Sequence, residues 1–113
     1  MNKDPFLFIQ HILESIKSIE SFMESIKKNG FMKNKEKQSA VVHQIEIIGE
    51  AAKNISNEFT NRYPSIHWSD IIRTRDKMIH NYFAIDLDIV WDIVKRDLPK
   101  LKEALHKIIS EEK

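Results

Sequence analysis

VVHQIEIIGEAAKNISNEF, residues 41–59, decides the fold class of this 113-residue chain. Its apolar residues recur at alternating steps of four and three, a spacing that places them on one stripe of an α-helix. These residues are Val41, Ile45, Ile48, Ala52, Ile55 and Phe59. The stripe predicts a helix that packs almost antiparallel against a first helix. Gly49 weakens a helix by about 1 kcal/mol relative to alanine, so we expect another helix to approach closely there.

The first helix is expected to begin with Asp4 as N-cap and Pro5 at its first position, and to continue to about Lys28. Residues 27–37 (KKNGFMKNKEK) predict a break before the second helix. The apolar residues of the first helix share one stripe at three-four spacing: Ile9, Ile12, Ile16, Ile19, Met23 and Ile26.

The second half of the chain predicts further helices. Residues 61–67, which contain Pro64, are expected to form a turn. Asp86 is expected to cap a later helix that Pro99 bends or restarts. We therefore predict a single all-α domain over residues 1–113, an up-and-down bundle of four to five helices.

Composition narrows the class of protein without choosing its partner. The chain has 18 Lys and Arg and 17 Asp and Glu, so its net charge is +1. Any contact with nucleic acid must therefore come from a local positive patch. The chain has no cysteine, which excludes disulfides and thiolate metal sites. Neither a signal peptide nor a run of about 20 apolar residues occurs, so we expect a cytoplasmic protein with no membrane partner.

Residues 68–83 (WSDIIRTRDKMIHNYF) carry the most unusual charge in the chain. Taken as one helix, they place Arg75 near the middle of an apolar stripe, where an unpaired guanidinium would cost several kcal/mol. The stripe consists of Trp68, Ile71, Ile72, Met78, Ile79 and Tyr82. Two interpretations stay open: Arg75 is ion-paired or extends along the apolar surface to water, or it belongs to a functional site.

Other polar residues gather around Arg75 on the same predicted helix. Asp76 and His80 are spaced i,i+4 at the edge of the stripe, and Tyr82 returns to the Arg75 side at i+7. Arg73 and Lys77 project beyond His80, where they form either a solvated surface or a weak RNA-phosphate contact.

A metal site is not expected. His43 and Glu46 stand three apart, a spacing found in di-metal helical bundles, but the first helix offers no inward-facing carboxylates to complete a ligand set. We therefore expect no metal and no cofactor.

The motif RDKMIHNY, residues 75–82, has the form R-x4-H-x-Y. Together with EIIGEAAKNIS (46–56), IHWSDIIR (66–73) and IVWDIVKRDLPKL (89–101), it resembles the HepT-like HEPN ribonuclease toxins from about Val41 onward. The resemblance implies a homodimeric HEPN bundle in which Arg75 and His80 are the ribonuclease residues and Asp76 assists them. It also implies a partner, an MNT-type nucleotidyltransferase antitoxin that silences the toxin by attaching AMP to Tyr82.

Such a site has a simple chemistry. The RNA supplies the nucleophile, its 2′-hydroxyl, so His80 is expected to transfer protons while Arg75 binds the phosphate, without a metal. Acid and base are two roles, so two copies of the chain facing across a twofold axis would complete a composite site at the dimer seam. A different class of function stays open: a noncatalytic helical subunit that binds a nucleotidyltransferase and helps to position its substrate.

Overall fold

The computed structural model describes residues 4–79 and 84–112 of the chain. Within these ranges the protein is built from helices, and its extended pairing is an isolated antiparallel bridge between Ile79 and Ile85. The predicted all-α class is confirmed. None of the described helices is long and apolar enough to cross a membrane. In chain order the elements are α1 (Pro5–Phe22), α2 (Lys28–Lys33), α3 (Lys35–Lys53), α4 (Asn57–Asn61), α5 (Trp68–Ile72), α6 (Thr74–Met78), α7 (Leu87–Asp92), the π-helical stretch η1 (Ile93–Asp97) and α8 (Leu98–Glu112).

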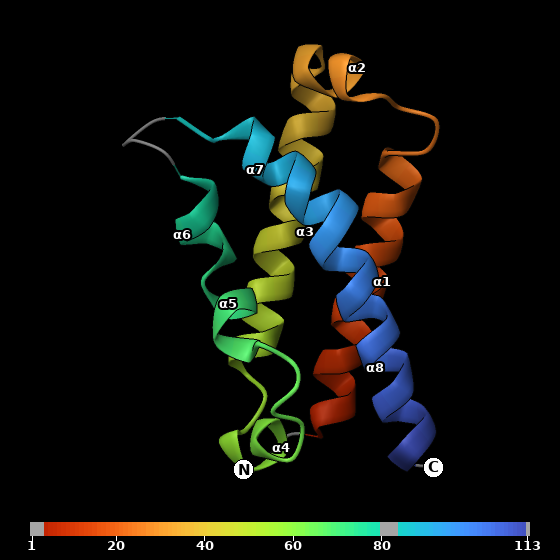
Figure 1. Cartoon of the computed structure of the whole chain (residues 1–113), viewed down its shortest axis with the longest axis vertical. Coiled ribbons are helices and arrows are strands. Elements are labelled where there is room, and N and C mark those ends of the chain that lie inside the picture. The colour runs from red at the N-terminus through yellow and green to blue at the C-terminus, as the bar shows by residue number, and fades with distance from the viewer. Residues whose placement is uncertain (1–3, 80–83, 113) are drawn as a thin grey trace.

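Helices α1 and α3 run side by side in opposite directions and form the centre of the fold (Figure 1). Asp4 caps α1 by accepting a 2.9 Å hydrogen bond from the Phe6 amide, and Pro5 follows it in the first turn, as predicted. The two apolar stripes lie in the core, where full burial of one isoleucine stabilises the fold by about 1.5–3 kcal/mol. The buried residues of these stripes are Ile9, Ile12, Ile16 and Ile19 of α1, and Val41, Ile45, Ile48 and Ala52 of α3.

The connection between α1 and α3 differs from the prediction. Helix α1 ends at Phe22 instead of near Lys28, and Ser25 has a positive φ of 62°, a conformation that a right-handed helix does not continue through. The predicted break at residues 27–37 contains helix α2. Phe31 on α2 is fully buried, with its ring centroid 5.8 Å from that of Trp91. This packing between distant segments stabilises a short helix that local sequence does not indicate.

The second predicted helix is also divided. Helix α3 ends at Lys53, and Ser56 caps the separate helix α4 by accepting a hydrogen bond from the Phe59 amide. Ile55 and Phe59 nevertheless remain in the core, as the apolar spacing predicted. The predicted turn over residues 61–67 connects α4 to α5.

The perturbation predicted at Pro99 takes the form of a π-helical stretch. Asp86 caps α7 as predicted, because its carboxylate accepts hydrogen bonds from the amides of Asp88 and Ile89. Pro99 has no amide hydrogen, and its ring would clash with the carbonyl group four residues earlier in a regular α-helix. The chain relieves this conflict by widening, so that the Leu98 amide bonds the Ile93 carbonyl, and α7, η1 and α8 follow one another without a loop.

The single helix predicted over residues 68–83 is wrong. The segment forms α5 and α6 with a break at Arg73, and the backbone becomes extended at Ile79. At the break the Thr74 hydroxyl donates a hydrogen bond to the Ile71 carbonyl, which competes with the regular helical hydrogen bonds. Both short helices lie along one side of α3, with α1 and α8 on the other side (Figure 1).

Candidate functional site

Arg75 lies on the surface of helix α6. The sequence placed it in an apolar stripe, but the break at Arg73 divides that stripe, and the Arg75 side chain is 70% exposed in a single chain. Trp68 and Met78 turn into the core, whereas Ile72 and Ile79 remain partly exposed. Of the two interpretations, the ion-paired surface position fits this chain on its own. An exposed guanidinium also remains accessible to an anion.

The partner of Arg75 is Glu46, on the neighbouring helix α3. Glu46 Oε2 lies 3.5 Å from Arg75 Nε, and the Glu46 side chain is 40% exposed. A pair this exposed is screened by water and contributes about 0–1 kcal/mol to stability. The ion pair therefore matters for the position of Arg75 more than for stability, because it joins Arg75 on α6 to the central helix α3.

Gly49 allows α3 to pack closely against the junction between α5 and α6. A Cβ atom at this position would lie 3.3 Å from the Ile71 carbonyl oxygen and 3.4 Å from that of Ile72, so the last turn of α5 packs directly against the α3 backbone. The close approach predicted at Gly49 is thus confirmed, and its partner is the α5–α6 junction. Because Glu46 lies one turn before Gly49 on α3, it faces the same neighbour.

His80 and Tyr82 lie outside the described residues, so their placement relative to Arg75 stays a prediction. The residues on either side are described. Ile79 and Ile85 form the antiparallel bridge, and the Asp86 amide donates a 2.7 Å hydrogen bond to the Met78 carbonyl. The backbone at residue 79 and at residue 85 therefore lies side by side at the end of α6.

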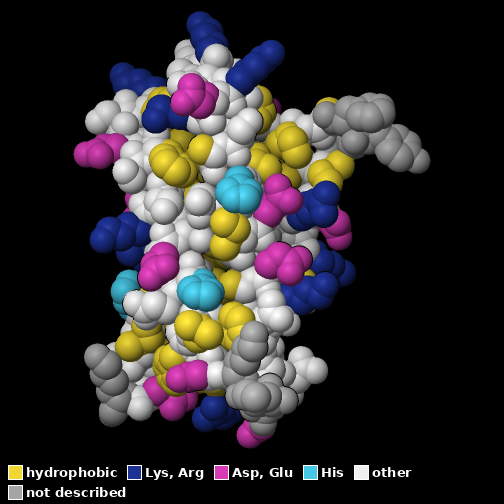
Figure 2. Space-filling view, turned by 180° about the vertical axis from the view of Figure 1, so that it is seen from behind, with side chains coloured by type: hydrophobic (Ala, Val, Ile, Leu, Met, Phe, Trp, Pro, Cys, Tyr) yellow, Lys and Arg dark blue, Asp and Glu magenta, His cyan; other side chains and the backbone are white. Residues whose placement is uncertain are grey.

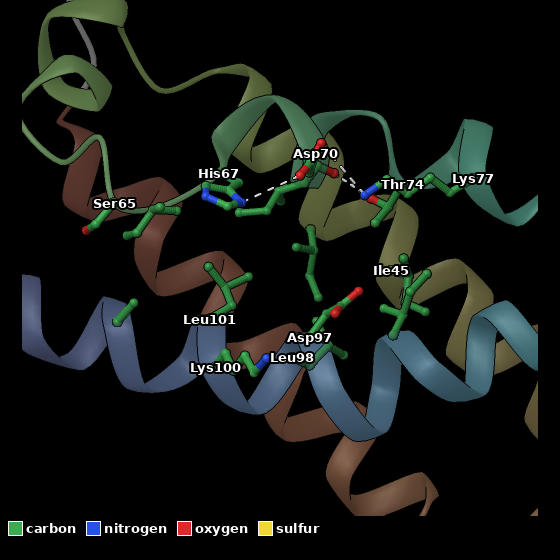
Figure 3. Close-up of a pocket in the computed structure, with 15 residues that line it drawn as sticks. Ile45, Ser65, His67, Asp70, Thr74, Lys77, Asp97, Leu98, Lys100 and Leu101 are labelled. Carbon is green, nitrogen blue, oxygen red and sulfur yellow. Dashed lines mark hydrogen bonds and ion pairs between the residues drawn. The ribbon is translucent and has the colours of Figure 1, made fainter.

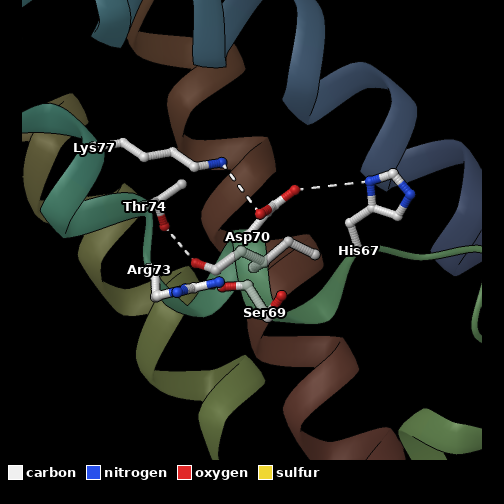
Figure 4. Close-up of polar contacts among 7 residues, drawn as sticks. His67, Ser69, Asp70, Arg73, Thr74 and Lys77 are labelled. Carbon is white, nitrogen blue, oxygen red and sulfur yellow. Dashed lines mark hydrogen bonds and ion pairs between the residues drawn. The ribbon is translucent and has the colours of Figure 1, made fainter.

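Arg73 and Lys77 point toward different residues of α5 (Figure 4). Lys77 Nζ lies 3.9 Å from Asp70 Oδ1, and Arg73 Nε donates a 3.4 Å hydrogen bond to the Ser69 carbonyl. Asp76 is exposed on α6. Arg73 and Lys77 thus contact α5, whereas Arg75 contacts Glu46 on α3. Their predicted contact with RNA phosphates remains a prediction.

A groove of about 360 Å³ lies between the α5–α6 segment and the η1–α8 segment (Figure 3). Its floor is apolar, whereas His67, Asp70 and Lys77 stand on one wall, with His67 Nδ1 3.7 Å from Asp70 Oδ2. Lys77 lines this groove, but Arg75 and Asp76 do not. Of the predicted residues that the structure describes, Lys77 therefore borders the groove, whereas Arg75 and Asp76 lie outside it.

The surface around Arg75 combines apolar and charged groups. Ile72, Ile79 and Ile85 are 37%, 40% and 39% exposed, although all three are large hydrophobic residues. Seen from behind, the side of the molecule that carries α5 and α6 also has alternating acidic and basic side chains (Figure 2). Ile72 precedes the start of α6, whereas Ile79 and Ile85 lie side by side beyond its end. Isolated exposed isoleucines are ordinary, but exposed isoleucines on both sides of α6 offer apolar surface that a partner can cover.

Away from this surface, Tyr63 has a shifted pKa. The Tyr63 hydroxyl donates a hydrogen bond to the Glu112 carboxylate, and this bond, followed by burial and the Glu112 charge, raises the pKa of Tyr63 above 10. The contact ties the loop before α5 to the end of α8. It is structural, because it involves neither Arg75 nor the groove.

The family is identified by comparison with known proteins. The family model described as Ribonuclease HepT-like matches residues 12–108. The chain belongs to the HepT-like ribonuclease family. The resemblance found in its motifs is therefore confirmed for the family. The HepT-like match includes α3, α5 and α6, so the Glu46–Arg75 contact lies within the matched region.

Individual relatives agree with this assignment to the HepT-like family. A Thermococcus cleftensis protein named probable ribonuclease HepT is 43% identical over 101 residues, which are 89% of this chain and 92% of the relative. A Methanocaldococcus jannaschii protein provisionally named as an RNase is 40% identical over 96% of this chain and 90% of its own length.

A second relative from Methanocaldococcus jannaschii is longer. Its name combines gamma-glutamylcyclotransferase with a provisional RNase, and it is 44% identical over 98% of this chain. This chain spans half of that relative's length. No solved structure gives a significant match to the chain.

Two features of the structure were not predicted from the sequence: the contact between Glu46 and Arg75, and the groove beside α5 and α6. Glu46 was considered only as a possible metal ligand with His43, because its contact with Arg75 joins residues far apart in the chain. The groove was missed because three separate segments line it. The i,i+3 spacing of His67 and Asp70 was the one local signal for part of it.

Proposed function

We propose that this member of the HepT-like family is a metal-independent endoribonuclease, with Arg75 and His80 as catalytic residues and Asp76 assisting them. One observation carries the proposal: in a chain of a ribonuclease family, the arginine of the R-x4-H-x-Y motif exposes its guanidinium on α6. This exposed position leaves the guanidinium accessible to an RNA phosphate.

The reaction follows from the groups available. A base removes the proton of the RNA 2′-hydroxyl, whose oxygen attacks the adjacent phosphorus, and the 5′-oxygen leaves with a proton from an acid. His80 serves in these proton transfers, since its reference pKa of about 6.5 lies near neutral pH. Arg75 stabilises the charge on the phosphate oxygens. The products are a 2′,3′-cyclic phosphate and a 5′-hydroxyl end.

The active form proposed is a homodimer. Acid and base are needed in the same step, and two copies of the chain bring two copies of His80 to one seam. The exposed Ile72, Ile79 and Ile85 near Arg75 support a second copy as the group that covers this surface. Apolar contacts would then surround a charged site, which excludes water and strengthens electrostatic contacts with the phosphate.

The biological role proposed is the toxin of a toxin–antitoxin pair. The partner would be an MNT-type nucleotidyltransferase, which joins the Tyr82 phenol oxygen to the α-phosphorus of ATP and releases pyrophosphate. The adenylate adds a negative charge close to the motif arginine in sequence. That charge would occupy Arg75 and prevent RNA from binding.

The chemistry of the products tests this function. Purified protein incubated with a short RNA should yield 2′,3′-cyclic phosphate and 5′-hydroxyl ends by mass spectrometry. The same oligonucleotide with 2′-deoxyribose at the cleaved position should resist cutting there, because the nucleophile is absent. Products with a 5′-phosphate, or cleavage at the deoxy position, would refute the mechanism. Absence of any RNA cleavage would instead favour a noncatalytic accessory subunit of a nucleotidyltransferase.

A further inference from the structure

Glu46 approaches Arg75 at a particular part of the guanidinium. Glu46 Oε2 lies 3.5 Å from Arg75 Nε, the guanidinium nitrogen nearest the side-chain stem. A guanidinium is planar and rigid, so holding one edge fixes the direction of the opposite edge. That outer edge, formed by the two terminal nitrogens, suits two oxygens of one phosphate.

The contact depends on backbone packing as well as on two long side chains. Gly49 lets the α3 backbone lie against the Ile71 and Ile72 carbonyl groups, and Thr74 Oγ1 would be 3.5 Å from a Cβ at Gly49. The α5–α6 junction is thus held against α3 immediately beside α6. Glu46, one turn earlier on α3, is directed to Arg75 by an arrangement that the fold itself fixes.

Charge alone gives Glu46 no obvious benefit at this position. The pair is exposed, so it adds little to stability. A carboxylate beside a phosphate-binding arginine also opposes the binding of an anionic substrate. The useful effect that remains is orientation of the guanidinium before RNA arrives, because a preorganised donor loses less freedom when it binds.

We propose that Glu46 is a positioning residue that orients Arg75 for the phosphate of the RNA. This inference rests on the proposed ribonuclease function. It assigns no direct contact with the substrate to Glu46, which acts through Arg75.

The test compares Glu46→Gln with Glu50→Gln, a matched change of an exposed carboxylate one turn further along α3. Glutamine keeps the size of the side chain but removes the charge that attracts the guanidinium. In steady-state RNA cleavage we expect kcat to fall about 10-fold in Glu46→Gln, with KM unchanged or lower because a repulsive charge is gone. Glu50→Gln should retain both constants. Equal kcat in Glu46→Gln and wild type would overturn the proposal, and so would an equal loss in both variants.

A second measurement does not depend on RNA cleavage. The ¹⁵N relaxation of the Arg75 Nε–H group, assigned by its loss in Arg75→Lys, reports how ordered the guanidinium is. The order parameter should be lower in Glu46→Gln than in wild type, and unchanged in Glu50→Gln, at equal melting temperature. An Arg75 signal equally mobile in all three proteins would refute the positioning role. A wild-type protein that orders Arg75 but cuts no RNA would refute the ribonuclease function instead.

Discussion

The Cβ atom that Gly49 lacks would lie 3.3 Å from the carbonyl oxygen of Ile71. This contact joins the central helix α3 to the junction between α5 and α6, the segment that carries Arg75. The neighbour is backbone, which yields less easily than the end of a side chain. The position of the α5–α6 junction against the core therefore depends on a residue without a side chain.

Replacing each of the two glycines of the chain by alanine should change stability in different ways. Gly30 is exposed on α2, and its nearest neighbour for a new Cβ is the flexible Ile26 side chain at 3.4 Å. Gly30→Ala should therefore raise the free energy of unfolding by about 0.5–1 kcal/mol, the usual gain of alanine in a helix. Gly49→Ala should show no gain or a loss, because the contact with backbone offsets it. Urea unfolding measures both, and an equal gain at Gly49 would contradict the close packing described.

Much of the fold was predictable because it follows from local rules. The caps at Asp4 and Asp86 depend on side chains next to the amides they bond, and the stripes of α1 and α3 depend on helical periodicity. Helix α2 was not predictable in this way, because the burial of Phe31 against Trp91 involves residues far apart in sequence.

The candidate site was predicted in its residue types but not in its geometry. The motif indicated Arg75, yet the break at Arg73 depends on a hydrogen bond from Thr74 and on packing against Gly49. Periodicity alone extends the helix through that point. An ion-paired Arg75 was one of the two interpretations left open, but its partner, Glu46 on the neighbouring helix α3, could not be predicted because the contact joins residues far apart in the chain.

The proposed dimer seam leads to a prediction about two variants, one inside the seam and one outside it. The wild-type protein should sediment as a dimer at micromolar concentration, and Ile79→Glu should be monomeric, because a charge at this exposed isoleucine would be buried in the seam. The monomer should also lose RNA cleavage by at least about 10-fold, since each site then lacks its second histidine. Leu7→Glu, an equally drastic change at an exposed leucine on α1, should stay dimeric and active. A dimeric Ile79→Glu protein would place the seam elsewhere.

The proposed silencing by a nucleotidyltransferase predicts a single modified tyrosine. The chain has two tyrosines, Tyr63 and Tyr82, so Tyr63→Phe is the natural control for Tyr82→Phe. Co-expression with a cognate MNT-type enzyme should add adenylate mass to wild type and to Tyr63→Phe, and should abolish their RNA cleavage. Tyr82→Phe should stay unmodified and active, because it lacks the acceptor oxygen. Peptide mass spectrometry checks the position, and an adduct on another residue would rule out Tyr82 as the switch.

The most direct test of the account is the rate of RNA cleavage in excess EDTA by wild type, Arg75→Ala and His80→Ala. Arg96→Ala and His106→Ala, which change an exposed arginine of η1 and an exposed histidine of α8, serve as controls. We predict that wild type and both controls cleave at the same rate with the chelator as without it. Arg75→Ala and His80→Ala should be slower by at least about 100-fold with unchanged helicity, the usual effect of losing a proton-transfer or charge-stabilising group. Loss of wild-type activity in EDTA, or full activity in His80→Ala, would contradict the account.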